Sequence, residues 1–315
     1  MKAREKFLTA LALTVSSAAA ISVINKLIFL CSTKDTSKIS QSSHTYEWRY
    51  GKINYTKCGS GKPILLIHDI DPSSSGYEWH GVAEKLSKER TVYTIDLLGC
   101  GLSDKPSITY TNFVFVQLIN NFVHDIIGKR TDVMTLNRSS SVALMACRYN
   151  ERLFDKLFLI NPESIEESLK IPSYYDKGKR ILFDSPFLGT LVYNIAYSRK
   201  LIYKDLLLKK VFNPCKIKWN DVLTYHKAAH YKGEQAKYLF SSIKSHYVNI
   251  NISSAVKEID NTIYILFGEH TENYHEIGNA FKRLNPSIEW DVANDTKELV
   301  PIENVSAVLD MIHLF

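Results

Sequence analysis

Cysteine is scarce in this sequence and never closely paired. The five cysteines are scattered, odd in number and without a Cys-x-x-Cys pair, which argues against a disulfide scaffold and a structural zinc site. The sequence also lacks a basic run interleaved with aromatic residues, and its net charge of +6 is mild for a nucleic-acid binder. We therefore expect no bound metal, no cofactor and no nucleic-acid partner.

The overall composition is that of a folded protein. Hydrophobic residues make up 45% and charged residues 23% of the 315 residues, which excludes disordered and fibrous chains. A chain of this length can bury a sizeable core, as one large domain or as a domain with an insertion.

The N-terminus carries the first specific pattern. Three basic residues precede an apolar stretch, Phe7–Leu30, and a membrane-spanning helix needs roughly 20 such residues. We therefore predict an N-terminal membrane anchor over residues 1–31, with the protein at the cell membrane by a single-pass helix. The alternative is a secretory signal cleaved near Ala18–Ala20, which would leave a secreted protein. Residues 32–45, rich in Ser, Thr and Lys, are predicted to form a linker.

From about Tyr46, short apolar runs alternate with amphipathic stretches. This alternation predicts a doubly wound, mostly parallel sheet with helices on both faces, an α/β fold. The predicted strands are Ile53–Cys58, Pro63–His68, Thr91–Asp96, Asp132–Leu136, Lys156–Ile160, Thr262–Phe267 and Ser287–Val292. The predicted helices are Tyr77–Lys88, Asn112–Ile127, Ser140–Tyr149, Glu272–Leu284 and Glu303–Phe315. In such sheets the chemistry lies at the carboxyl ends of the strands.

A glycine-containing loop, Asp96–Pro106, follows the third predicted strand. It lacks the third glycine of a dinucleotide-binding loop, and Asp-Lys-Pro follows where a helix should start. Its Asp-x-x-Gly-x-Gly-x-Ser-x-x-Pro pattern resembles a loop of the α/β-hydrolase superfamily, and the run ending at Asp69 resembles that family's His-Gly turn. The two motifs also occur in the family's order, before a strand that leads to a serine turn.

The resemblance implies an α/β-hydrolase core over residues 46–164 and 257–315. It also implies a helical cap over residues 165–256, where the superfamily commonly carries an insertion. This insertion is rich in aromatic residues and holds fifteen Lys and Arg residues against seven Asp and Glu residues. A cap of this kind would shape an apolar pocket over the strand ends.

The family's nucleophile elbow, Gly-x-Ser-x-Gly, is matched only loosely. The corresponding stretch is Asn137-Arg138-Ser139-Ser140-Ser141, in which Ser139 falls on the nucleophile and polar residues replace both glycines. The elbow holds its serine at a sharp strand-to-helix turn. The resemblance therefore predicts Ser139 as the catalytic nucleophile, and the alternative is that these serines cap the following helix.

The remaining catalytic positions are substituted. The resemblance places the family's acid at Thr271 and its histidine at Glu298, with Glu163 as an alternative position for the acid. A serine needs a base within hydrogen-bonding reach, so Glu298 would have to act as a non-standard base. The oxyanion hole is expected to use the backbone N–H groups of Ile70 and Ser140.

Two functions follow from these residues. One is a membrane-tethered serine hydrolase of esters or related acyl substrates that uses Ser139. The other is a catalytically inactive pseudo-hydrolase that binds a small apolar ligand, a lipid or a protein partner. The fold alone does not choose between them.

Overall fold

The computed structural model describes residues 20–32 and 43–314. An eight-stranded sheet runs through the protein in the order β1-β2-β4-β3-β5-β6-β7-β8. β2 pairs antiparallel with β1 and with β4, and the other neighbours are parallel. The strands are β1 Ser43–Trp48, β2 Gly51–Cys58, β3 Lys62–Ile67, β4 Arg90–Ile95, β5 Thr131–Leu136, β6 Phe154–Ile160, β7 Thr262–Gly268 and β8 Glu289–Ala293. The predicted mostly parallel α/β sheet is confirmed, and β1 begins inside the segment predicted as a linker.

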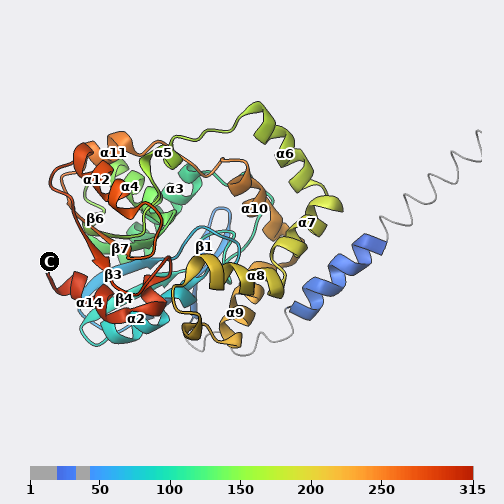
Figure 1. Cartoon of the computed structure of the whole chain (residues 1–315), viewed down its shortest axis with the longest axis horizontal. Coiled ribbons are helices and arrows are strands. Elements are labelled where there is room, and N and C mark those ends of the chain that lie inside the picture. The colour runs from blue at the N-terminus through green and yellow to red at the C-terminus, as the bar shows by residue number, and fades with distance from the viewer. Residues whose placement is uncertain (1–19, 33–42, 315) are drawn as a thin grey trace, which may run out of the picture.

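Helices cover both faces of this sheet (Figure 1). The core helices are α2 His80–Leu86, α3 Asn112–Phe122, α4 Ser139–Tyr149, α11 Ser253–Glu258, α12 Tyr274–Leu284, α13 Val300–Glu303 and α14 Val305–Leu314. Helices α3 and α11 both pack against α4, and α2 packs against α14. The hydrophobic core is therefore split into two layers by the sheet.

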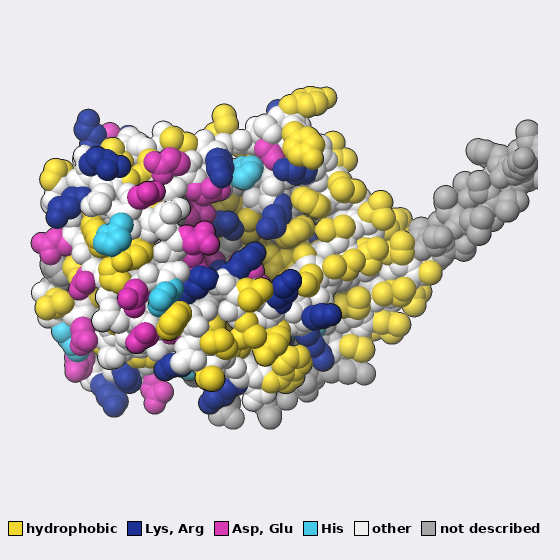
Figure 2. Space-filling model, in the orientation of Figure 1, with side chains coloured by type: hydrophobic (Ala, Val, Ile, Leu, Met, Phe, Trp, Pro, Cys, Tyr) yellow, Lys and Arg dark blue, Asp and Glu magenta, His cyan; other side chains and the backbone are white. Residues whose placement is uncertain are grey.

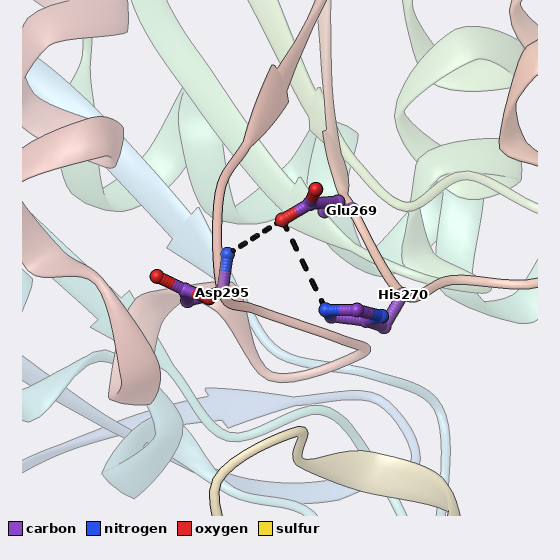
Figure 3. A group of neighbouring side chains, drawn as sticks. All are labelled: Glu269, His270 and Asp295. Atoms are coloured by element: carbon purple, nitrogen blue, oxygen red, sulfur yellow. Dashed lines mark hydrogen bonds and ion pairs between the residues drawn. The ribbon is translucent and has the colours of Figure 1, made fainter.

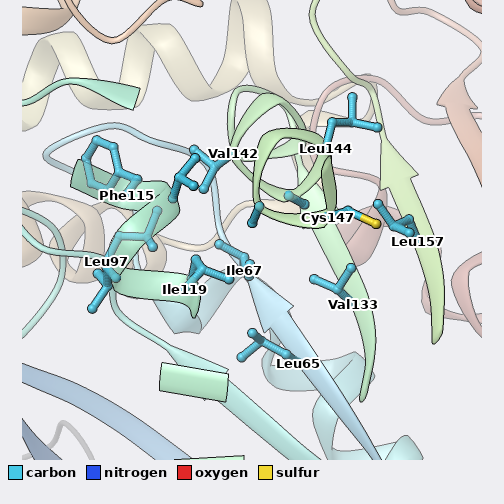
Figure 4. Packing of buried hydrophobic residues seen from close by; sticks show 14 of the residues in the cluster. Leu65, Ile67, Leu97, Phe115, Ile119, Val133, Val142, Leu144, Cys147 and Leu157 are labelled. Atoms are coloured by element: carbon cyan, nitrogen blue, oxygen red, sulfur yellow. The ribbon is translucent and has the colours of Figure 1, made fainter. Parts of the chain in front are cut away.

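Strand β3 shows how the sequence builds these two layers. Side chains alternate between the faces of a strand, so Leu65 and Ile67 join one apolar cluster and Ile64 and Leu66 join the other. All four are fully buried, as expected for a central strand covered on both faces. Figure 4 shows Leu65 and Ile67 beside residues of α3 and α4.

Residue Asp96 organises the loop that follows β4. Its carboxylate accepts hydrogen bonds from the backbone N–H groups of Gly76 (2.7 Å) and Leu102 (2.9 Å) and from the Asn54 side chain (2.9 Å). Gly101 has a φ of +48°, and a Cβ there would lie 2.4 Å from Asp96 Cγ. The glycine is thus required by the close approach of this carboxylate.

A long helical insertion separates β6 from β7. Its α-helices are α5 Ile165–Ser168, α6 Tyr174–Asp184, α7 Leu188–Ala196, α8 Arg199–Asp205, α9 Trp219–His230 and α10 Lys237–Lys244, and a short π-helix, η4 Leu206–Lys210, follows α8. We call α5 to α10, with η4, the inserted helices. Figure 1 shows α6 to α10 grouped on one side of the molecule, away from α2, α12 and α14.

The N-terminal helix over residues 20–32 packs against the inserted helices. Asn25 Oδ1 accepts a hydrogen bond from Asn194 Nδ2 of α7 (2.8 Å), and the rings of Phe29 and His230 lie 5.3 Å apart. Across the described ranges, no helix has the length and apolarity needed to cross a membrane. The predicted single-pass anchor and its cell-membrane location are therefore wrong for this part of the chain, where Asn25 is buried against Asn194 of the inserted helices. Residues 1–19 of the predicted anchor or signal, and 33–42 of the predicted linker, lie outside the described residues.

Candidate functional site

The carboxyl ends of four parallel strands converge with one further loop. The converging segments are 68–71 after β3, 137–138 after β5, 161–163 after β6, 268–271 after β7, and 297–298 before α13. Hydrogen bonds and ion pairs connect these segments directly. They form the candidate site, at the edge where α/β sheets place their chemistry.

Asn137 forms the sharp turn between β5 and α4. It directly follows the last strand residue and has a φ of +51°, a conformation that few residues other than glycine, asparagine and aspartate adopt readily. Its N–H donates to Ile160 O of β6 (2.9 Å), and its C=O accepts from Ser140 N (3.1 Å). Asn137 therefore holds the strained position of the turn.

Ser139 lies two residues further on, as the first residue of α4, and is fully buried. Its Oγ accepts a hydrogen bond from Leu136 N (3.0 Å) and lies within donating distance of Leu136 O (2.8 Å) and Ile67 O (3.2 Å). Within the described part of the chain, no hydrogen bond joins Ser139 Oγ to an imidazole or a carboxylate. The hydroxyl is thus directed into the backbone beneath the turn.

The oxyanion hole is expected to use the backbone N–H groups of Ile70 and Ser140. Ile70 is buried in the turn after β3, but the N–H of Ser140 donates to Asn137 O. The N–H that follows the turn residue belongs to Arg138, and it donates to Asp69 Oδ1 (3.2 Å). A carboxylate therefore already accepts from the N–H beside the turn.

The Asp69 carboxylate is 7% exposed and has three donors around it. Besides Arg138 N, Lys210 Nζ of η4 lies 3.1 Å from Oδ2, and the Asn137 amide nitrogen lies 3.3 Å from the same oxygen. Burial alone would raise the pKa of Asp69, but the charges of Lys210 and Arg138 outweigh burial and hold it below its usual value. Asp69 is therefore ionised and forms an ion pair with an inserted helix.

Glu298 faces the Asn137 amide from the other side. In the alternative orientation of that amide, its nitrogen lies away from Asp69 and donates instead to Glu298 Oε2 (3.1 Å) and to Asn161 O (3.3 Å). Burial raises the pKa of Glu298, with the negative charge of Asp69 adding to the rise and Lys210 opposing it. The structure thus brings Glu298 to the turn residue, beside Asn137 rather than Ser139.

Thr271 is hydrogen-bonded to Asn161, which directly follows β6 and has a φ of +47°. Asn161 Oδ1 accepts from Thr271 Oγ1 (3.0 Å) and from Gly268 N (2.9 Å), while its Nδ2 donates to the carbonyl groups of Lys297 (2.9 Å) and Glu298 (3.2 Å). One asparagine therefore joins the ends of β6 and β7 to the loop before α13. Sequence reasoning missed Asn161, although an asparagine directly after a predicted strand also marks the left-handed turn at Asn137.

Glu163, the alternative acid, forms a salt bridge. Its Oε1 accepts from Arg138 Nε at 2.6 Å. The pair lies at the ends of two neighbouring strands, so Glu163 serves as a partner of the elbow arginine.

Two further buried groups lie below the turn after β3. His68 accepts from Leu97 N at Nε2 (3.0 Å), and its Nδ1 lies 2.6 Å from Asp69 O, so its ring is neutral with the proton on Nδ1. Burial lowers the pKa of His68. Burial, reinforced by the charge of Asp69, raises the pKa of Glu78 to about 8. Among the described residues, neither side chain forms a hydrogen bond with Ser139 Oγ.

A cleft of about 480 Å³ opens between the loop after β3 and the inserted helices. Its floor includes Asp71 and Ser74, and its far wall includes Tyr197, Tyr225 and Phe240. Lys210, the partner of Asp69, also lines this space. The charged cluster at the strand ends therefore borders a cleft large enough for a small organic molecule.

Another cluster, Glu269, His270 and Asp295, offers three potential metal ligands. All three side chains are exposed, Glu269 already accepts a hydrogen bond from Asp295 N (2.9 Å), and the His270 ring stacks on Phe212 at 3.7 Å. Figure 3 shows Glu269 interacting with the His270 ring and with the backbone N–H of Asp295. These three residues therefore form a hydrogen-bonded cluster on the surface.

Comparisons with known proteins agree with this architecture. A family model described as the alpha/beta hydrolase fold matches residues 62–131. The structure of an epoxide hydrolase, CorEH, is similar, with 20% identity, coverage of 87% of this chain and 98% of that one, and a TM-score of 0.71. The chain has the α/β-hydrolase fold. An esterase from Thermogutta terrifontis shares this fold at 15% identity, with coverage of 87% and 97% and a TM-score of 0.68.

Sequence relatives of this α/β-hydrolase-fold chain match over shorter stretches. An uncharacterized protein of Mycobacterium tuberculosis is 31% identical over 113 residues, which are 36% of this chain and 33% of that protein. A soluble epoxide hydrolase of Corynebacterium sp. (strain C12) is 28% identical over 110 residues, 35% of this chain and 38% of the enzyme. The chain thus spans about a third of the length of these curated relatives. The resemblance to α/β-hydrolases drawn from the sequence is confirmed at the level of the fold.

Proposed function

We propose that this chain is an α/β-hydrolase-fold protein that binds a small ligand in its cleft without hydrolysing esters. The observation that carries the proposal is the elbow. The superfamily's nucleophile belongs at the strained residue of the strand-to-helix turn, and the residue with a positive φ there is Asn137. We infer that Asn137 stands at the nucleophile position and that Ser139 is a structural serine.

The expected partners of a nucleophile support the same conclusion. Acyl transfer needs a base that accepts the proton of the nucleophile. An asparagine amide does not supply such a nucleophile, and Glu298 lies against that amide. The hydroxyl of Thr271, at the proposed acid position, donates to Asn161 and orients no base.

The region expected to bind an oxyanion is electrostatically unsuited to it. A tetrahedral intermediate carries a negative oxygen, which hydrogen-bond donors must stabilise. Here the Arg138 N–H already donates to the ionised Asp69 carboxylate. A second negative charge beside Asp69 would be repelled, because like charges a few ångströms apart interact strongly in a partly buried site.

Ligand binding remains available to this geometry. We propose that the inserted helices act as a cap, because they supply the far wall of the 480 Å³ cleft. Buried tyrosine and phenylalanine side chains there offer an apolar surface. In this proposal the ion pair between Lys210 and Asp69 fixes the cap to the core.

The second candidate function is a serine hydrolase that uses Ser139, and the similar structure of the Thermogutta terrifontis esterase favours it. That function would require Ser139 Oγ to leave its bonds to Leu136 and Ile67 and to reach a base. The test is hydrolysis of p-nitrophenyl esters of increasing acyl length by purified wild-type protein and by Ser139→Ala. We expect both proteins to match the uncatalysed rate. Turnover by the wild type that Ser139→Ala abolishes would establish the hydrolase instead.

A further inference from the structure

Lysine side chains dominate the charge of the cleft. Lys204, Lys209, Lys210 and Lys244 line it from α8, η4 and the end of α10, whereas Asp71 and Asp205 are the acids in its lining. Figure 2 shows Lys and Arg side chains together with Asp and Glu side chains along the hollow in the middle of this face. The cleft therefore holds more positive than negative groups.

Both acids of the lining already have partners. Asp71 accepts from Ser73 N (2.9 Å), Ser73 Oγ (2.6 Å) and Tyr197 OH (2.9 Å). Asp205 lies 3.4 Å from Lys209 Nζ, and Lys210 is paired with Asp69. The remaining cations, Lys204 and Lys244, have no salt bridge to any carboxylate among residues 20–32 and 43–314.

The wall beside these lysines is apolar. Ile202, Leu206, Tyr225 and Phe240 line the same cleft, and each is at most 5% exposed. The Lys244 ammonium lies 6.0 Å from the centre of the Phe240 ring, so a cation and an apolar wall adjoin each other. A ligand that satisfies both must carry a negative head and an apolar body.

We propose that the cleft binds an amphiphilic organic anion. Its head is held by Lys204 and Lys244, and its apolar body lies against Ile202, Leu206 and Phe240. Lysine ammonium groups act as point charges and suit a carboxylate or a sulfate equally. This inference rests on the proposed function, in which the cleft binds a ligand that the protein does not hydrolyse.

Isothermal titration with full-length protein tests the ligand class. The probes are octanoate and octyl sulfate as anions, with octanol and octylammonium as neutral and cationic comparators, all below their aggregation concentrations. We expect both anions to bind more tightly than octanol, no binding of octylammonium, and weaker anion binding as salt is raised. Binding of octanoate alone would assign the head as a carboxylate.

The lysines are tested by the double substitution Lys204→Gln/Lys244→Gln. Both side chains are exposed, so the variant should fold, and its melting temperature verifies this. We expect its affinity for octanoate to fall roughly tenfold with octanol binding unchanged, since each charge contributes on the order of threefold in a hydrated site. The matched control is Lys257→Gln, an exposed lysine of α11 outside the cleft, which should bind like the wild type.

Two outcomes would overturn the proposal. One is equal affinity for octanoate and octanol in the wild type, and the other is unchanged octanoate affinity in the double variant. Failure of the proposed function gives a different result, because release of octanoate from its p-nitrophenyl ester by the wild type would establish turnover. That release would leave the preference for an anion intact.

Discussion

The ion pair between Lys210 and Asp69 gives the sharpest prediction for this site. Its N–O distance is 3.1 Å, and the side chains are 23% and 7% exposed. Lys210→Met keeps most of the apolar stem and removes the charge, which leaves Asp69 ionised and nearly buried. Breaking a buried pair from one side costs about 3–5 kcal/mol. We expect about 2–3 kcal/mol here, because the Arg138 N–H still donates to Asp69 and Lys210 is partly hydrated.

Urea denaturation at pH 7 measures this loss, and Lys209→Met is the matched control. Lys209 is the neighbouring lysine, its side chain is 76% exposed, and its partner Asp205 is also exposed, so its removal should cost about 0.5 kcal/mol or less. Asp69→Asn and the double variant Lys210→Met/Asp69→Asn complete a cycle whose coupling energy isolates the pair.

The pH dependence of the loss has a definite sign. Because the pKa of Asp69 is held below its usual value in the folded wild type, its stabilisation is present above the unfolded pKa of about 3.9 and is lost as the pH falls through the lower folded pKa. In Lys210→Met, burial is no longer opposed by Lys210, so the carboxyl takes up a proton at higher pH. The difference between wild type and Lys210→Met should therefore shrink between pH 7 and pH 4.5. A loss no larger than that of Lys209→Met, with no coupling to Asp69, would refute this account of the ion pair.

Three further predictions concern buried groups of the site. Ser139→Ala should lower the free energy of unfolding by about 1 kcal/mol, measured in urea, because the hydroxyl bonds only backbone groups; an unchanged stability would argue against that structural role. Asn161→Ala should cost about 2–4 kcal/mol and Thr271→Val only about 1 kcal/mol, since Asn161 makes four side-chain hydrogen bonds and Thr271 contributes one of them; equal losses would contradict the central role of Asn161. Glu78 has its folded pKa raised to about 8, so the wild type should lose stability as the pH rises from the unfolded value towards 8, on the order of 5 kcal/mol in total. Melting curves between pH 5 and pH 9 should show no such loss of stability in Glu78→Gln. If the stability of Glu78→Gln falls with pH as that of the wild type does, Glu78 is not the source of the loss.

The sequence predicted the sheet well because its signals are local. Short apolar runs such as Pro63–His68 are buried on both faces, and parallel strands of this kind form where helices cover both sides. The loop Asp96–Pro106 added a pattern whose glycine is required by contact with Asp96. These constraints act within a few residues, so a single sequence reveals them.

The register of the elbow was harder to predict. The Gly-x-Ser-x-Gly template was anchored on a serine, which put the nucleophile at Ser139. The structure places the left-handed residue two positions earlier, directly after the strand. Asn137 carried a signal for this, since asparagine tolerates a positive φ that arginine and serine adopt less readily. The proposal that Asn137 stands at the nucleophile position rests on this backbone conformation, whereas the prediction of Ser139 rests on residue type.

The charges around the turn could not be predicted from the sequence. Asp69 and Lys210 are 141 residues apart in the chain, and their contact depends on how the inserted helices fold back over the strand ends. The contacts of Asn161 with Thr271 and with the loop before α13 are of the same kind. Such pairings follow from tertiary packing, which local patterns do not encode.

The most direct test of the central claim is the mass of the intact protein after treatment with a fluorophosphonate, which phosphonylates an activated serine. We expect the folded wild-type chain to gain no phosphonyl group, because Asn137 occupies the turn and Ser139 Oγ is bonded to Leu136 and Ile67. A single phosphonyl group that peptide mapping places on Ser139, and that is absent in Ser139→Ala, would contradict the account.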